Sequence, residues 1–412
     1  MQPVKITILG DFIDCQIYRG RLYLWTFDGS IQVYKWNELV NSLSDDENEK
    51  LPLKFCFLDG NYLYKNDLVD LFQDSEFKDI LLRKFERLEY NDYILSSYQM
   101  ANFLYGEQDT PKNSIPTDTE IYSSSLYFAT EEGLFVASAH RDSKKYPVSS
   151  RPKKIWDCNL LSLKANRYPQ LALSGGSEGL FELDLSSQAI REPAQISNKH
   201  SSFANYNYWS IYNSSNVGNS YLALFDLNEE LEKKFGVFAF SKLKRKFNKI
   251  VSEGSIFQDN NELNNSKFLS WGTDDKIYRA TGSGFEIVRF KNKPDLNNDE
   301  KYFTKIREVN LLPWKGSVIG GGTSYFGTIV ECENALVILL SNGENLTIQG
   351  PITRWRVYPR SINYQNHLHV IKDDRIEIYS FNQDYFLEQN TKVYGIAHRN
   401  EPEYRNRFSK NH

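Results

Sequence analysis

Aliphatic and aromatic residues gather in short runs along this chain, and the runs come in pairs joined by an acidic or glycine turn. Three clear pairs begin at Leu22 (LYLWTFDGSIQVYKW), Leu126 (LYFATEEGLFVASA) and Leu171 (LALSGGSEGLFELDL). Successive side chains of a strand point to opposite faces, and here both faces are mostly apolar. Each run is therefore predicted to be a strand covered on both sides, and each turn glycine supplies the positive φ that a hairpin needs.

Looser copies of the same pair begin at Tyr221, Lys276, Thr328 and Leu368, which makes seven copies in all. Apart from one wide gap, neighbouring turns are about 40 to 55 residues apart, close to the length of a four-stranded propeller blade. Sheets arranged around a ring cover both faces of every strand. The sequence thus predicts an all-β fold, a seven-bladed β-propeller that occupies residues 1–412 as a single domain.

The wide gap separates Gly29 from Gly133 and contains the clearest helical pattern of the chain. Across the stretch 66–95, apolar residues recur at spacings of three and four, the stripe of an amphipathic helix. Asp74 or Ser75 is placed to cap its second part. We therefore expect a small α-helical insertion at 59–116, after the first blade, made of two short helices and a polar surface loop. Its apolar stripe either packs on the rim of the ring or stays free for a partner.

A ring of blades also needs a strand that closes it. Val4–Leu9 reads as a lone strand ahead of the first repeat, and the last repeat supplies only three strands. The segment Asp384–Ile396 competes for the fourth place. We favour the N-terminal strand, because pairing it with the last repeat leaves no open edge between the two ends of the ring.

Composition narrows the classes of function. The 412 residues carry 49 basic and 53 acidic side chains, a net charge of -4, so no dominant attraction to nucleic acid or an anionic membrane is expected. The four cysteines have no short paired spacing that would suit a zinc site. Neither a secretion signal nor an apolar segment long enough to cross a bilayer is visible, so we expect a cytoplasmic protein without metal or cofactor.

Two of the turn-and-strand phrases, EEGLFVAS from Glu131 and SEGLFELDL from Ser177, are similar to those of sensor-type propellers. The chain as a whole resembles the β-propeller superfamily in the broad sense that includes Trp-Asp repeat proteins. It departs from true Trp-Asp repeats because no Gly-His pair opens a blade and Trp156-Asp157 is the only dipeptide of its kind. The resemblance implies a seven-bladed ring and carries over no binding residues.

Five tryptophans recur about one blade apart, at 156, 209, 271, 314 and 355. Such large rings either wedge between neighbouring blades, where a propeller needs bulk, or line one face as anchors for a partner. The first interpretation is favoured because tryptophan is usually buried. Trp271 and Trp314 are nevertheless retained as candidate partner-binding residues.

The segment RWRVYPR, residues 354–360, is the strongest candidate for a binding surface. Its candidate residues are Arg354, Trp355, Arg356, Tyr358 and Arg360. Arginine beside aromatic groups suits phosphate, bases or an acidic peptide. The alternative, which we favour, is that these arginines pair with carboxylates of neighbouring strands.

Other polar features of the sequence give weaker evidence for a binding site. The basic runs 140–154 and 242–249 are expected in exposed connections. The glycine cluster 316–323 precedes a strand rather than a helix, so it predicts crowded backbones near the channel and no phosphate loop. His367 and His369 share one face of a strand, where they are more typical of edge polar residues than of a metal site.

The sequence therefore favours a non-catalytic protein–protein interaction platform, a scaffold within a multi-protein complex. One alternative is a small-ligand sensor or an enzyme that uses the central funnel. The other is a nucleic-acid-binding propeller that uses Arg354, Arg356, Lys242 and Lys244, which predicts one contiguous positive face.

Overall fold

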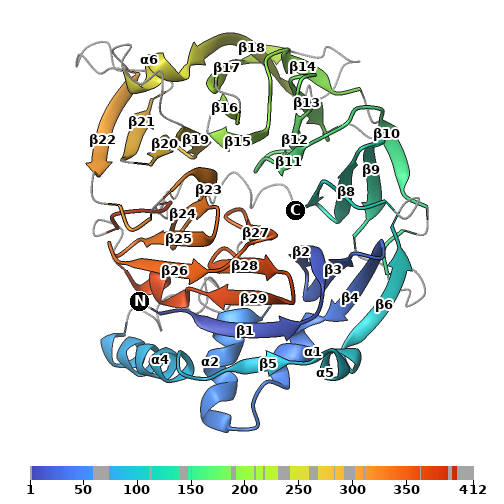
Figure 1. Ribbon diagram of the computed structural model, residues 1–412, viewed down its shortest axis with the longest axis vertical. Coiled ribbons are helices and arrows are strands. Elements are labelled where there is room, and N and C mark those ends of the chain that lie inside the picture. Colours follow the sequence, from blue (N-terminus) through green and yellow to red (C-terminus); the bar gives the residue numbers. More distant parts are fainter. Residues whose placement is uncertain are drawn as a thin grey trace, which may run out of the picture.

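The computed structural model describes most of the chain. It covers residues 2–396 apart from 59–73, 111–113, 140–146, 150, 187–191, 208–209, 217–218, 231–241, 259–267, 283, 292–301, 310–311, 315, 362 and 388–391; for 226–230, 242–245 and 248 only the backbone is described. Seven sheets stand around a central axis, as Figure 1 shows. The chain is a seven-bladed β-propeller, which confirms the predicted fold.

Each blade is an antiparallel sheet whose inner strand lies at the axis. The first two blades are β2 (Phe12–Tyr18), β3 (Arg21–Thr26), β4 (Ser30–Lys35) and β6 (Leu104–Asp109), then β7 (Asp118–Tyr122), β8 (Ser125–Thr130), β9 (Gly133–Ser138) and β10 (Lys153–Trp156). The third and fourth are β11 (Ser162–Ala165), β12 (Gln170–Ser174), β13 (Leu180–Asp184) and β14 (Ala194–Ser197), then β15 (Phe203–Asn207), β16 (Ser210–Ser214), β17 (Tyr221–Glu230) and β18 (Lys242–Ser252).

The fifth and sixth blades follow the same order. They are β19 (Phe268–Thr273), β20 (Lys276–Thr281), β21 (Phe285–Phe290) and β22 (Phe303–Val309), then β23 (Val318–Ser324), β24 (Gly327–Cys332), β25 (Ala335–Leu340) and β26 (Asn345–Gln349). Short helices α6 (Glu253–Phe257) and η4 (Asn382–Phe386) follow blades four and seven. Apolar clusters fill the spaces between neighbouring blades, as expected for strands that are apolar on both faces.

The seventh blade closes the ring with the N-terminal strand. It consists of β27 (Arg354–Val357), β28 (His367–Lys372), β29 (Arg375–Ser380) and β1 (Val4–Leu9). β1 pairs antiparallel with β29, with Val4 opposite Ser380. A short fifth strand, β5 (Tyr93–Leu95), runs parallel to β1 and covers its outer side. The predicted closure is confirmed, and β5 protects the edge that β1 would otherwise expose.

Two of the predicted hairpin glycines show why that residue is needed. Gly133 has φ 131° and Gly179 has φ 103°. A Cβ at either position would also overlap the backbone carbonyl of the outer strand of the same blade, that of Trp156 or Ser197. The turn thus needs glycine both for its backbone conformation and for the close approach of a neighbouring strand.

The helical insertion lies between β4 and β6, the third and fourth strands of the first blade. It contains α1 (Trp36–Asn41), α2 (Glu47–Phe57), α4 (Ser75–Leu88) and α5 (Ser97–Ala101). It therefore begins before residue 59. The polar residues Glu107–Asp109, expected in a surface loop, belong instead to the outer strand β6, which pairs with β4. These residues are polar because one side of an outer strand faces water. The first expected helix falls largely on 59–73, outside the described residues.

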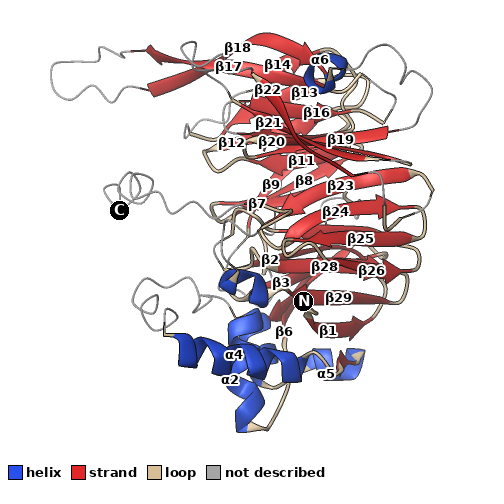
Figure 2. Ribbon diagram, turned by 90° about the vertical axis from the view of Figure 1, so that its left-hand side faces the viewer, coloured by secondary structure: helices blue, strands red, loops and turns tan. Residues whose placement is uncertain are grey.

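The insertion packs against the rim of the ring. Helix α4 buries Leu81, Phe85 and Leu88, and the Phe85 ring contacts Phe386 of η4 at a centroid distance of 6.4 Å. The Asp74 carboxylate caps this helix by accepting from the Phe77 N–H at 2.8 Å, as predicted. Figure 2 shows α2, α4 and α5 of the insertion at one end of the molecule, far from α6. The apolar stripe of α4 is thus used in packing rather than left free.

Candidate functional site in the central channel

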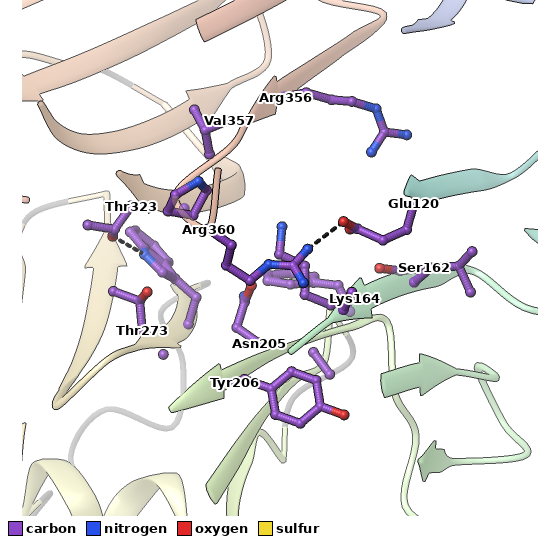
Figure 3. A pocket seen from close by; sticks show the side chains of 18 of the residues that line it. Glu120, Ser162, Lys164, Asn205, Tyr206, Thr273, Thr323, Arg356, Val357 and Arg360 are labelled. Carbon is purple, nitrogen blue, oxygen red and sulfur yellow. Dashed lines mark hydrogen bonds and ion pairs between the residues drawn. The ribbon is translucent and has the colours of Figure 1, made fainter. Parts of the chain in front are cut away.

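The inner strands enclose a polar cavity at the axis. Its volume is about 460 Å³, and residues of β7, β11, β15, β19, β23 and β27 line it, as the close view in Figure 3 shows. An inner strand turns alternate side chains toward the axis and toward the core between blades. In β11, for example, Leu163 and Ala165 are buried in the core while Ser162 and Lys164 line the cavity.

An arginine–carboxylate network crosses the channel wall. The Arg356 guanidinium donates to the Asp14 carboxylate at 2.5 and 2.6 Å and to Asp118 at 2.8 Å. Arg354 lies 3.3 Å from Asp14 and 3.5 Å from Asp118 and also donates to the Thr117 carbonyl at 2.9 Å. These contacts join the seventh blade to the first and the second. Two arginines share two carboxylates, so their charges balance.

The buried Asp14 carboxylate is ionised because of its partners. Burial raises the pKa of this carboxyl group, whereas the neighbouring Arg356 and Arg354 lower it. The arginines together outweigh burial, so the pKa lies below the usual value near 3.8. Nearer the other end of the channel, Arg360 pairs with Glu120 and donates to the Asn166 carbonyl at 2.9 Å. The favoured interpretation of the arginine segment, pairing with neighbouring carboxylates, agrees with these contacts.

Beside the seventh blade, the channel wall that β23 contributes is built on glycine. In β23 a Cβ on Gly320 would overlap the Glu331 carboxylate, and one on Gly321 would overlap the Trp271 ring. The indole N–H of Trp355 donates to Glu331 at 2.8 Å, and burial raises the pKa of that carboxyl. The glycine cluster is thus a strand with crowded neighbours at the channel, as its sequence predicted.

The tryptophans are mainly packing residues where the structure describes them. Trp271 is fully buried and stacks on Tyr278 at 5.7 Å, while Trp314 is 5% exposed and meets Phe285 edge-on. This burial favours the wedging role over the anchoring role. Trp156 and Trp355 are half-buried, and Trp209 lies outside the described residues. A partner-binding role for Arg354, Trp355, Arg356, Tyr358 and Arg360 remains a prediction.

The two histidines do not lie at an edge. His367 and His369 are on the middle strand β28 and are almost fully buried. The His369 Nδ1 lies 3.2 Å from the Tyr358 hydroxyl and 3.6 Å from the Cys15 thiol, while His367 Nε2 donates to the Cys56 carbonyl of α2 at 2.8 Å. Burial lowers the pKa of both rings, that of His367 to about 4, so both are neutral at pH 7. Among the described residues, no group of three possible metal ligands occurs.

Several channel residues were not found from the sequence. Asp14, Asp118, Glu120 and Lys164 come from the inner strands of three blades and form the charged wall with the arginines. Only their place near the start of a blade could have pointed to them. The side chains of Lys242 and Lys244 lie outside the described residues, as does most of the run 140–154.

Comparisons with known proteins add no family. No family model and no curated protein matches the chain. Among solved structures, it is similar to the β-propeller domain of Myceliophteria thermophila Cps50 (Swd1), with 8% identity, a TM-score of 0.48, and coverage of 90% of this chain and 96% of that one. It is also similar to Kluyveromyces lactis Hsv2 (11%, 0.39, 69% and 77%) and the AfRom2 CNH domain (13%, 0.36, 65% and 94%). With TM-scores below 0.5, these likenesses carry no argument here, and the fold rests on the seven sheets.

One further finding concerns membranes. Within the part of the chain that the structure describes, the helices are all too short or too polar to span a bilayer.

Proposed function

We propose that this chain is a non-catalytic interaction platform, a subunit of a protein complex that receives its protein partner at one mouth of the central channel. The observation that carries the proposal is that the arginines of the channel wall are engaged with the carboxylates beside them. Asp14 and Asp118 hold Arg354 and Arg356, and Glu120 holds Arg360. Carboxylates held in this way build a rigid wall and do not stand free for proton transfer.

Exposed apolar side chains at one mouth favour a protein as the partner. Leu161, just before β11, is 44% exposed, and Ile319, at the start of β23, is 53% exposed; both line the cavity. Inner strands run in the same direction, as the parallel pairing of Asn207 with Asp274 illustrates, so both side chains belong to the mouth at which inner strands begin. Apolar groups beside a charged rim are typical of protein interfaces.

A rigid ring suits this role energetically. Loops that are already fixed in place lose little conformational entropy when a partner docks. The nucleic-acid alternative has less support, because carboxylates already neutralise Arg354, Arg356 and Arg360. Nothing in the described wall favours the enzyme alternative over binding.

The test is affinity purification of the tagged full chain from its source cells at native salt, with bound proteins identified by mass spectrometry. The doubly substituted variant Leu161→Asp, Ile319→Asp should lose proteins that the wild type retains. The matched control is Ile306→Asp, which changes an aliphatic residue of β22 that is 41% exposed on an outer strand. Equal recovery by all three proteins, or recovery of nothing by the wild type, would contradict the proposal.

A further inference from the structure

Lys164 differs from the arginines that share its cavity. It lies on β11, in the channel wall, and its side chain makes no hydrogen bond or ion pair with any residue that the structure describes. Its nearest carboxylates are engaged elsewhere, since Glu120 pairs with Arg360 and Asp118 with Arg356. Two carboxylates balance Arg354 and Arg356, and a third balances Arg360. The Lys164 ammonium is therefore left without a counter-charge in contact.

Neighbouring polar groups around the cavity also lack partners. Ser162 lies two residues before Lys164 on the same strand, Asn205 comes from the adjacent inner strand β15, and Thr273 from β19; Figure 3 labels all of them in the cavity. Within the described part of the chain, none of these three side chains takes part in a hydrogen bond. Each has a hydroxyl or amide group that can donate to a bound oxygen.

Electrostatics agrees with this geometry. Burial lowers the pKa of the Lys164 ammonium below its usual value, Glu120 acts in the opposite direction, and Arg360 adds to the lowering. Lys164 is half-buried, and withdrawing a cation from water without a partner is costly, so an anion in contact with it reduces that cost. Ammonium, amide and hydroxyl donors all form stronger hydrogen bonds to an oxygen that carries negative charge than to a neutral oxygen.

We propose that the channel contains a binding site for a small oxyanion group, a phosphate or a carboxylate, held by the Lys164 ammonium with the help of Ser162, Asn205 and Thr273. The cavity of about 460 Å³ admits a small molecule that carries such a group. Glu331 lies on another part of the lining and is not paired with a cation among the described residues, so the ligand carries its anionic end toward Lys164 on β11. This site goes beyond the proposed partner surface, because it lies inside the channel and not at its mouth.

The test is isothermal titration calorimetry of the purified full chain with inorganic phosphate and, separately, with succinate at constant ionic strength. We expect at least one of the two anions to bind with a stoichiometry of one, and the stronger of the two identifies the source of the oxyanion. The variant Lys164→Met should weaken that binding at least tenfold. The matched control, Lys153→Met, removes an exposed lysine from β10 and should leave it unchanged.

Two further measurements keep the test decisive. If Lys164→Met does not fold, Asn205→Asp replaces it: the new carboxylate faces the same cavity and should abolish binding of either anion. Affinity should also fall as the pH rises through the lowered pKa of Lys164, because the neutral amine loses its attraction for the anion. Absence of binding by the wild type at millimolar anion, or equal weakening by Lys153→Met, would overturn the proposal.

The outcome is separable from that of the partner experiment. The uncharged variant Leu161→Ser, Ile319→Ser removes the apolar groups without adding carboxylates to the cavity lining. It should release the protein partner and still bind the anion, while Lys164→Met should behave in the opposite way. If both variants lost both the protein partner and the anion, the two ligands would share one site, and the proposal of a separate anion site would be wrong.

Discussion

The Arg356 guanidinium of the last blade donates to both carboxylate oxygens of Asp14 in the first blade, at 2.6 Å from Nε and 2.5 Å from Nη2. This paired contact lies on the channel side of the junction where the two ends of the ring meet. β1 bridges the same junction through its pairing with β29. The ring is therefore fastened twice, by main-chain hydrogen bonds away from the axis and by a buried ion pair toward it.

Removing one member of this pair should be costly. Arg356→Met leaves the fully buried Asp14 carboxylate with only Arg354 as a charged partner, so we expect a loss of about 3–5 kcal/mol in the free energy of unfolding. Arg289→Met breaks a more exposed pair with Asp275 at 3.5 Å and should cost under about 1 kcal/mol. Urea denaturation measures both. Equal losses would show that burial of Asp14 does not matter.

Crowding at β23 predicts an effect of the smallest possible substitution. Gly321→Ala places a Cβ against the ring of Trp271. Because this ring is fully buried, the strand or the indole must shift to make room. Overpacking of this kind costs about 1–3 kcal/mol. The matched control is Gly254→Ala in α6, where a Cβ meets nothing within 4 Å and should be neutral or stabilising by up to about 1 kcal/mol. The midpoint of thermal unfolding should therefore fall for Gly321→Ala and stay the same or rise for Gly254→Ala.

His367 predicts a loss of stability in weak acid. Its pKa is about 4 in the folded chain and near 6.5 when exposed, so the unfolded state binds the proton more tightly. Its contribution is complete above pH 6.5 and disappears as the pH falls toward 4, a change of about 3 kcal/mol in the free energy of unfolding. His367→Gln keeps a donor for the Cys56 carbonyl and should flatten this part of the pH dependence. An unchanged profile would mean that other groups cause the acid sensitivity.

Packing of the insertion on the ring predicts that α4 is part of the cooperative unit. Phe85→Ala removes a ring that is 1% exposed and contacts Phe386, so about 3–5 kcal/mol should be lost. Ile80→Ala on the same helix, where Ile80 is 40% exposed, should change the free energy of unfolding by about 0.5 kcal/mol or less. Chemical denaturation followed by tryptophan fluorescence compares them. If Phe85→Ala were as mild as Ile80→Ala, the helix would not be docked.

Local patterns explain what the sequence revealed of the fold. Gly133 and Gly179 occupy turns that demand glycine, and strand β1 was visible as a short apolar run with no partner nearby in sequence. Helix α2 escaped notice because Pro52 interrupts it and its apolar residues follow no clean stripe. Strand β6 was not predicted because its second half, Glu107–Asp109, is entirely polar, as an outer strand with one side in water can be.

The candidate site could be predicted less completely from the sequence, for a different reason. Arg354 and Arg356 stood out as a basic-aromatic segment, but their partners Asp14 and Asp118 are far away in sequence and ordinary in their local context. Lys164 sits in a short strand, SLKA, with nothing unusual around it. Convergence at the axis depends on which side of each inner strand faces inward, and that is fixed by tertiary packing rather than by neighbours along the chain.

The use of β1 as the closing strand has a consequence for biosynthesis. Val4–Leu9 is translated before the first six blades, yet its partner Arg375–Ser380 is translated after them. Until then the nascent segment has a bare edge that invites mispairing with other chains. The pairing that closes the ring can form only after the sixth blade has been synthesised, so ring closure is the last step of assembly.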